Sequence, residues 1–124
     1  MAKKQKTRLL AADVDTFEII SPLMAKLYAD VQELAKKKPD GILSRTRTDM
    51  INRLLDSARI LLKEEQSINF LDMIDFDSVP QNADAMLILG QYLSALTAYK
   101  DKYTDGEAWD KYWLVSDSNQ QRKV

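Results

Sequence analysis

Four aspartates near the middle of the chain are the residues best suited to hold a hard cation: Asp72, Asp75, Asp77 and Asp84. Ca²⁺ and Mg²⁺ prefer several oxygen ligands, but this spacing lacks the central glycine and the terminal glutamate of an EF-hand loop. We therefore expect no bound metal. Asp75 and Asp77 are expected to solvate a loop, and Asp84 to occupy the first turn of a helix, where negative charge is favourable. A divalent-cation-dependent enzyme using this group is the most distant function that we consider.

A second group of candidate residues is basic and flanks a turn at Pro39 and Gly41. Its members are Lys36, Lys37, Lys38, Arg45, Arg47 and Arg53. If the helices on the two sides of the turn are antiparallel, these cations meet at one end of a bundle, where they could contact the phosphates of a nucleic acid. Aromatic residues do not interleave with them, and the formal net charge of the chain is −1. A solvated helix end is the simpler interpretation, and a nucleic-acid-associated helical subunit is the alternative function.

A third group is aromatic and lies toward the C-terminus: Tyr99, Tyr103, Trp109, Tyr112 and Trp113. Aromatic side chains anchor protein interfaces because they desolvate a large area while keeping a polar atom. Trp109, Tyr112 and Trp113 have the i, i+3, i+4 spacing of a short helical turn. Two interpretations stay open: this segment is a lid on the end of the bundle, or it anchors a partner protein.

The chain contains neither cysteine nor histidine. The first absence excludes disulfides, thiol nucleophiles and cysteine-ligated metals. The second removes the usual general base near neutral pH and excludes Ser–His–Asp catalysis. The sequence also has no HExxH motif and no glycine loop that would cradle phosphates. We therefore expect no catalytic residues, no cofactor and no enzyme activity.

Three long amphipathic segments must position these groups, at about residues 13–38, 44–65 and 82–103. In the first, the apolar residues from Phe17 to Leu34 are spaced by three and four, so they form one stripe of a helix. Pro22 either starts that helix or kinks it. In the third, Gly90 costs about 1 kcal/mol relative to alanine and could allow a neighbouring helix to approach. The apolar stripes either meet inside one monomer or pair with another chain.

Strand signals are weak, and no Asn-Gly hairpin signature occurs. The sequence thus predicts an all-α fold, a small antiparallel bundle of three long helices plus one or two short ones at 67–76 and 109–113. We expect one helical domain at 13–115, a flexible basic N-terminal segment at 1–12 and a flexible polar tail at 116–124. Because strands are not expected, nucleic-acid recognition by a sheet with stacked aromatics is not expected either.

Size and composition are those of one globular domain: 124 residues, of which 45% are apolar and 30% charged. No apolar run is long enough for a membrane span, and no secretory signal occurs, so we expect a cytoplasmic protein without membrane contact. Residues 1–63 have 13 Lys and Arg against 8 Asp and Glu, whereas residues 64–124 have 5 against 11. This split can guide partners or join the two halves. We expect a non-enzymatic protein–protein interaction module (a subunit, adaptor, inhibitor or antitoxin-like factor), whose partner is another protein or a second copy in a homodimer.

Overall fold

The computed structural model describes residues 8–117 and 122–124. Three α-helices make up most of the protein: α1 (Ala11–Lys37), α2 (Arg45–Leu61) and α3 (Asn82–Lys102). Two 3-10 helices lie between α2 and α3, η1 (Gln66–Phe70) and η2 (Phe76–Ser78). Three two-residue strands follow α3: β1 (Thr104–Asp105), β2 (Tyr112–Trp113) and β3 (Arg122–Lys123). Across the described residues, none of the helices is both long and apolar enough to cross a membrane.

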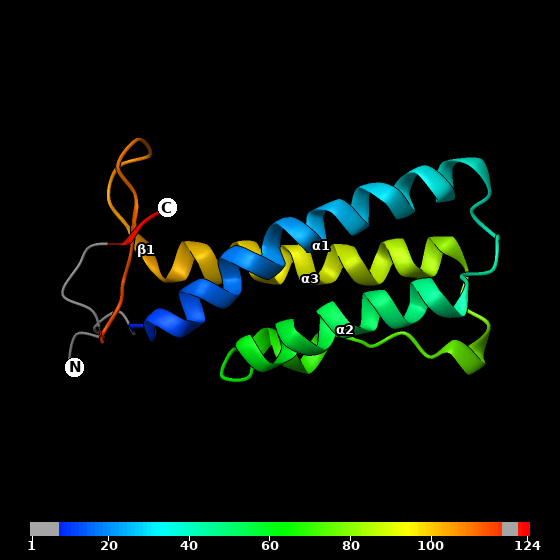
Figure 1. The fold of residues 1–124 in the computed structure, drawn as a ribbon, viewed down its shortest axis with the longest axis horizontal. Helices are drawn as coiled ribbons and strands as arrows, with labels where there is room; N and C mark the ends of the chain where they lie inside the picture. The colour runs from blue at the N-terminus through cyan, green and yellow to red at the C-terminus, as the bar shows by residue number, and fades with distance from the viewer. Residues whose placement is uncertain (1–7, 118–121) are drawn as a thin grey trace.

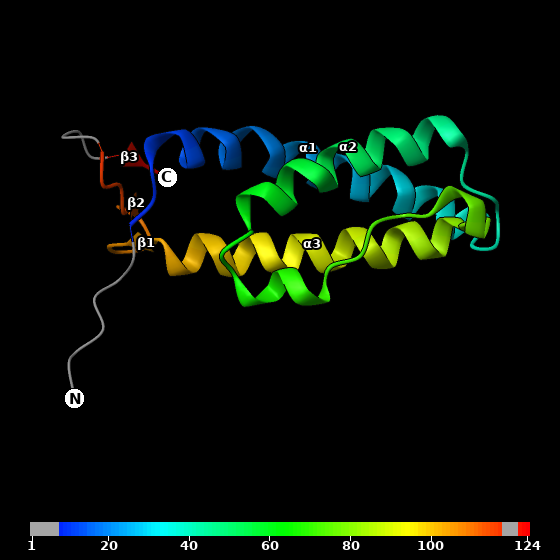
Figure 2. The ribbon, with the colours of Figure 1, turned by 90° about the horizontal axis from the view of Figure 1, so that it is seen from below.

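The helices form a layered arrangement in which α1 is antiparallel to both α2 and α3 (Figure 1). The α1 helix packs most extensively against α3 and less against α2, while α2 and α3 touch each other only slightly. In Figures 1 and 2, α2 and the segment 62–81 lie together on one side of the α1–α3 pair. The loop between β1 and β2 rises on the other side (Figure 1).

The first helix is continuous through Pro22, so this proline does not start it. Helix α1 begins at Ala11, where the backbone N–H of Leu10 donates to the Asp13 carboxylate at 3.2 Å. Pro22 is exposed, which lets its ring sit in the helix without displacing core residues. The apolar stripe faces inward as its spacing predicts: Phe17 and Met24 are both buried against the other helices.

The turn from α1 into α2 is joined to the start of α3. Ser44 caps α2 by accepting a hydrogen bond from the backbone N–H of Arg47 at 3.1 Å. The backbone N–H of Asn82 donates to the carbonyl of Gly41 at 2.8 Å, and the Asn82 side chain donates to the carbonyl of Lys38 at 3.0 Å. Gly41 is buried between these groups, so the three helices share one fixed end.

The connection from α2 to α3 is long and contains η1 and η2. It spans residues 62–81 and returns along α2, so that α2 and α3 run parallel (Figure 2). Side chains of α2 hold it in place. Asn52 both donates to and accepts from the backbone of Ile74, at 2.7 and 3.0 Å, and Arg59 donates to the carbonyl of Leu71 at 2.8 Å. The expected helix at 67–76 is reduced to η1 and η2.

The all-α prediction is wrong at the C-terminal end, where a small antiparallel sheet has the order β1-β2-β3. Thr104 pairs with Trp113, and Trp113 pairs with Arg122. Gly106, with φ of +98°, reverses the chain after β1. The expected helical turn at 109–113 does not form, because five residues gain too few helical hydrogen bonds to offset nucleation, whereas strand pairing satisfies backbone groups of Tyr112 and Trp113.

Both expected terminal segments include residues with defined contacts. Leu9 is bridged to Val115 in parallel orientation, and its N–H donates to the carbonyl of Leu114 at 2.8 Å. Arg122 and Lys123 pair with β2 and form ion pairs with Asp15 and Asp110. The remainder of these two segments, residues 1–7 and 118–121, lies outside the described residues.

Candidate functional site

The structure separates the two tryptophans that the sequence places together. Trp113 is buried, and its ring lies edge-on to Phe17 with centroids 5.0 Å apart. Phe17 in turn stacks on Tyr99 at 5.9 Å, and Tyr99 contacts Tyr103 at 4.8 Å. Trp109, in contrast, is 84% exposed. The lid interpretation therefore describes Trp113, whereas Trp109 remains free to contact a partner.

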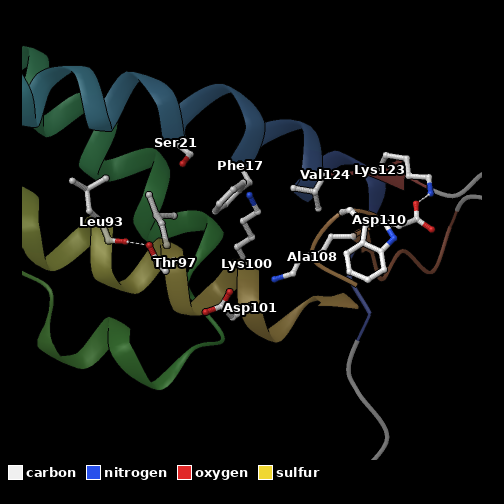
Figure 3. Close-up of a pocket in the computed structure, with 13 residues that line it drawn as sticks. Phe17, Ser21, Leu93, Thr97, Lys100, Asp101, Ala108, Asp110, Lys123 and Val124 are labelled. Carbon is white, nitrogen blue, oxygen red and sulfur yellow. Dashed lines mark hydrogen bonds and ion pairs between the residues drawn. The ribbon is translucent and has the colours of Figure 1, made fainter. Parts of the chain in front are cut away.

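Trp109 lines a cleft of about 680 Å³, which we call the Trp109 cleft. Figure 3 shows Phe17 and Ser21 of α1 on one side of this cleft and Thr97 of α3 on the other. Its polar lining is of mixed charge: Lys100, Lys111 and Lys123 against Asp101 and Asp110. Asp110 is paired with Lys123. The cleft therefore offers aromatic and aliphatic surface with nearly balanced charge, which suits a protein surface better than a polyanion.

A shallower hollow lies farther along the same pair of helices, and we call it the Tyr28 hollow. It has a volume of about 450 Å³, and its lining includes Tyr28 from α1 and Leu87, Gly90 and Ser94 from α3. Within the described part of the chain, neither this hollow nor the Trp109 cleft is lined by a residue of α2. Both therefore belong to the side of the α1–α3 pair that α2 leaves uncovered.

These two depressions are joined by two stripes of uncharged residues, which together we call the open face. On α1 the stripe is Ser21, Ala25, Tyr28 and Gln32. On α3 the stripe is Ala83, Leu87, Gly90, Ser94 and Thr97. The spacings, four and three in alternation, keep each stripe on one side of its helix. Every one of these residues is at least partly exposed.

The lack of charge on the open face is unusual for this chain. Helix α3 contains no charged residue from Ala85 to Tyr99, although 30% of the whole sequence is charged. The exposed surface of α2, by comparison, includes Arg47, Asp49 and Arg53. A helix that is uncharged all round is normally covered on every side. The open face thus has the composition of a covered surface, although the described residues leave it open.

Leu87 marks the face most clearly, because it is 68% exposed within the uncharged stretch of α3. Nearby, Gln91 Oε1 is a buried oxygen for which the described residues provide no hydrogen-bond partner. Sequence reasoning from the buried stripe of α3 missed this second stripe. The signal that could have identified it is the absence of charge on the helix positions that point away from the apolar stripe.

The basic residues flanking the α1–α2 turn do reach one end of the molecule, but they form no enclosed site. All six are exposed. Lys36 is paired with Glu33 at 3.3 Å, and the guanidinium of Arg45 lies 4.4 Å from the centre of the Phe76 ring. Arg53 lies two turns farther along α2 than Arg45. These residues therefore form a solvated helix end, in which some of the cations interact with side chains of the same protein.

The small sheet does not supply the stacking platform that some nucleic-acid-binding sheets use, because Trp113 is buried in the core. Among the aspartates, Asp84 accepts from the backbone N–H of Gln81 at 2.8 Å and caps α3. Asp75 accepts from the backbone N–H of Asp77 and from Ser78 Oγ, at 3.0 and 2.8 Å. In the part of the chain that the structure describes, no group of three or more acidic side chains could hold a metal ion.

One partly buried polar cluster lies just beyond the end of α2. Glu65 accepts from Tyr103 Oη at 2.7 Å and from Lys102 Nζ at 3.0 Å. Burial, followed by the hydrogen bond to Glu65, raises the pKa of Tyr103, and the hydrogen bond to Glu65 raises the pKa of Lys102. All three groups are satisfied by one another, so the cluster joins α3 to the end of α2 and leaves no reactive group free.

Comparison with known proteins adds no family: no protein-family model matches the chain, and no curated protein or solved structure matches it.

Proposed function

We propose that this protein is a non-enzymatic interaction module that binds another protein chain through the open face and Trp109. The observation that carries the proposal is the uncovered, charge-free surface that runs from the Tyr28 hollow to the Trp109 cleft. The apolar part of this surface, above all Leu87, is stabilised when a partner removes it from water, and its uncharged polar part carries no charge that a partner would have to desolvate. An exposed tryptophan at its end fits the aromatic residues that dominate binding energy at interfaces.

A photo-crosslinking experiment with a matched control tests this proposal. The photoreactive residue p-benzoylphenylalanine is placed at Leu87 on the open face or at Ile60 on α2. The two native side chains have nearly equal exposures, 68% and 65%, so they differ in location rather than in accessibility. After irradiation in the native host, the variant at position 87 should give a discrete protein adduct, and the variant at position 60 should not. Equal labelling from both positions, or no adduct from position 87, would refute the proposal.

A phosphate-binding function at the basic end is the second candidate, supported by the five exposed cations that flank the α1–α2 turn: Lys36, Lys37, Lys38, Arg45 and Arg47. Binding to a generic oligonucleotide should then weaken steeply as salt rises, because each phosphate contact releases a counterion. Replacing Lys37 and Lys38 by glutamine should weaken that binding and reduce the slope. No binding at low salt would eliminate this candidate.

A further inference from the structure

We infer that the occupant of the open face is a second copy of this chain, related by a two-fold axis that passes close to Ser94. This inference rests on the proposed function and names its partner. A two-fold interface places the same surface of both subunits in contact, so it must be complementary to itself. The open face meets that requirement in charge, in shape and in size.

Charge is the first requirement. Any charged side chain near a two-fold axis is brought close to its own copy, which is unfavourable for like charges. The stripes of the open face are free of charge from Ser21 to Gln32 and from Ala83 to Thr97. Charged residues begin only at the ends, with Lys100 and Asp101 at the Trp109 cleft. Self-contact of this face therefore brings no like charges together along its centre.

Shape is the second requirement, and the exposed side chains of Leu87 and Trp109 beside the two depressions are placed to meet it. The Tyr28 hollow and the Trp109 cleft are neighbours along the open face and meet near Ser94, so a two-fold axis at that point exchanges them. Leu87 of one copy then faces Trp109 of the other, and the same contact occurs twice. These two side chains are both strongly exposed in the single chain. Small residues near the axis, Ala25 and Ser94, allow the helices of the two copies to approach.

Size is the third requirement. The α3 stripe from Ala83 to Thr97 is about 21 Å long at 1.5 Å per residue, and two adjacent helices are roughly 20 Å wide. A buried tryptophan contributes roughly 200 Å² more. Together these areas are of the same order as the roughly 800 Å² that each partner contributes to a standard interface. A dimer of moderate affinity is therefore the expected assembly.

Sedimentation velocity of the pure protein tests the inference with variants matched in exposure. The wild type should form a dimer, and Leu87→Glu should raise the dimer dissociation constant at least thirtyfold because the substitution acts at both copies of the contact. Trp109→Ala should also raise it strongly. Ile60→Glu, equally exposed but on α2, should change the dissociation constant less than threefold. Far-UV circular dichroism should show that all three variants keep their helices.

Tryptophan fluorescence gives an independent measurement. Trp113 is buried in the single chain and Trp109 is exposed, so acrylamide quenching should fall with rising protein concentration as Trp109 becomes covered. In Trp109→Phe this concentration dependence should disappear. A wild-type protein that stays monomeric at roughly 0.5 mM, where even a weak dimer is populated, would overturn the inference. Equal weakening by Leu87→Glu and Ile60→Glu would overturn it as well.

The crosslinking experiment distinguishes failure of this inference from failure of the proposed function. An adduct at position 87 with twice the 14.2 kDa mass of the chain supports both. An adduct of another mass refutes the second copy as the occupant but supports the interaction module. No adduct from position 87 refutes both.

Discussion

Replacing Gly90 by alanine should stabilise the folded protein, although the residue lies on the surface proposed to bind a partner. A Cβ atom built at Gly90 has Tyr28 Cε2 at 3.8 Å as its nearest neighbour, which is an ordinary van der Waals contact. Glycine inside a helix costs about 0.8–1.0 kcal/mol relative to alanine. Because no neighbour must move, Gly90→Ala should recover most of that free energy, about 0.8 kcal/mol. In a chain of this length the melting temperature should rise by roughly 3 °C.

Gly41→Ala is the control for this prediction. A Cβ at Gly41 would lie 2.8 Å from Asn82 Nδ2 and 3.1 Å from the carbonyl oxygen of Lys38. These are the two atoms of the hydrogen bond that ties the α1–α2 turn to α3, so the substitution should cost about 1–3 kcal/mol. Urea unfolding followed at 222 nm gives both values. It should be repeated at two protein concentrations, because self-association stabilises the folded state. A destabilised Gly90→Ala, or a neutral Gly41→Ala, would refute the reasoning.

Three further predictions concern other parts of the molecule. Val79 is exposed and has φ of +54°, which a β-branched residue rarely adopts. Val79→Asn should therefore raise the free energy of unfolding by about 0.5–1 kcal/mol in urea titrations; no gain would show that its backbone is unstrained. Trp113→Ala should cost about 3–5 kcal/mol, but Trp109→Ala less than about 0.5 kcal/mol in dilute protein; equal losses in thermal melts would contradict the different burial of the two rings. Stability should change little from about pH 6 to 9, because the chain has no histidine. It should fall above about pH 10, because burial raises the pKa of three tyrosines, Tyr92, Tyr99 and Tyr103. The folded state keeps these protons when the unfolded state releases them, so their stabilising contribution is lost as pH rises. Urea midpoints should fall over the same pH range in which tyrosinate absorbance shows that the buried tyrosines lose their protons. Tyrosinate formed by these three residues in the folded protein near pH 10 would contradict the raised pKa values.

The three long helices could be predicted from the sequence because apolar spacing is a local property. Phe17 and Met24 on α1, and Leu89 and Leu96 on α3, are buried as their spacing indicates. Pro22 remained ambiguous, because proline is tolerated at a helix start and can also lie within a helix. Pro22 lies within a continuous helix because both halves of α1 pack against the rest of the core, and these contacts join distant parts of the chain.

The C-terminal sheet could not be predicted because its causes are tertiary. Each strand has only two residues, too short for a period-2 pattern to show. Trp109, Tyr112 and Trp113 also have helical spacing. Trp113 is held instead by its contact with Phe17, which lies nearly a hundred residues away in the sequence. The parallel bridge between Leu9 and Val115 is equally distant. Local patterns give no information on such pairings.

The candidate site follows from the uneven way in which the rest of the chain covers the central pair of helices. Helices α1 and α3 make the principal contact of the fold. One side of this pair of helices is covered by α2 and by the connection 62–81, which Asn52 and Arg59 hold in place. On the other side, within the described residues, the β1–β2 loop rises (Figure 1), and Trp109 and Val124 line the cleft there. Such asymmetry would leave an ordinary helix with charged residues on its exposed side, yet α3 is uncharged from Ala85 to Tyr99. That mismatch between exposure and composition is removed if a second protein surface, which we infer to be another copy, takes the place opposite α2.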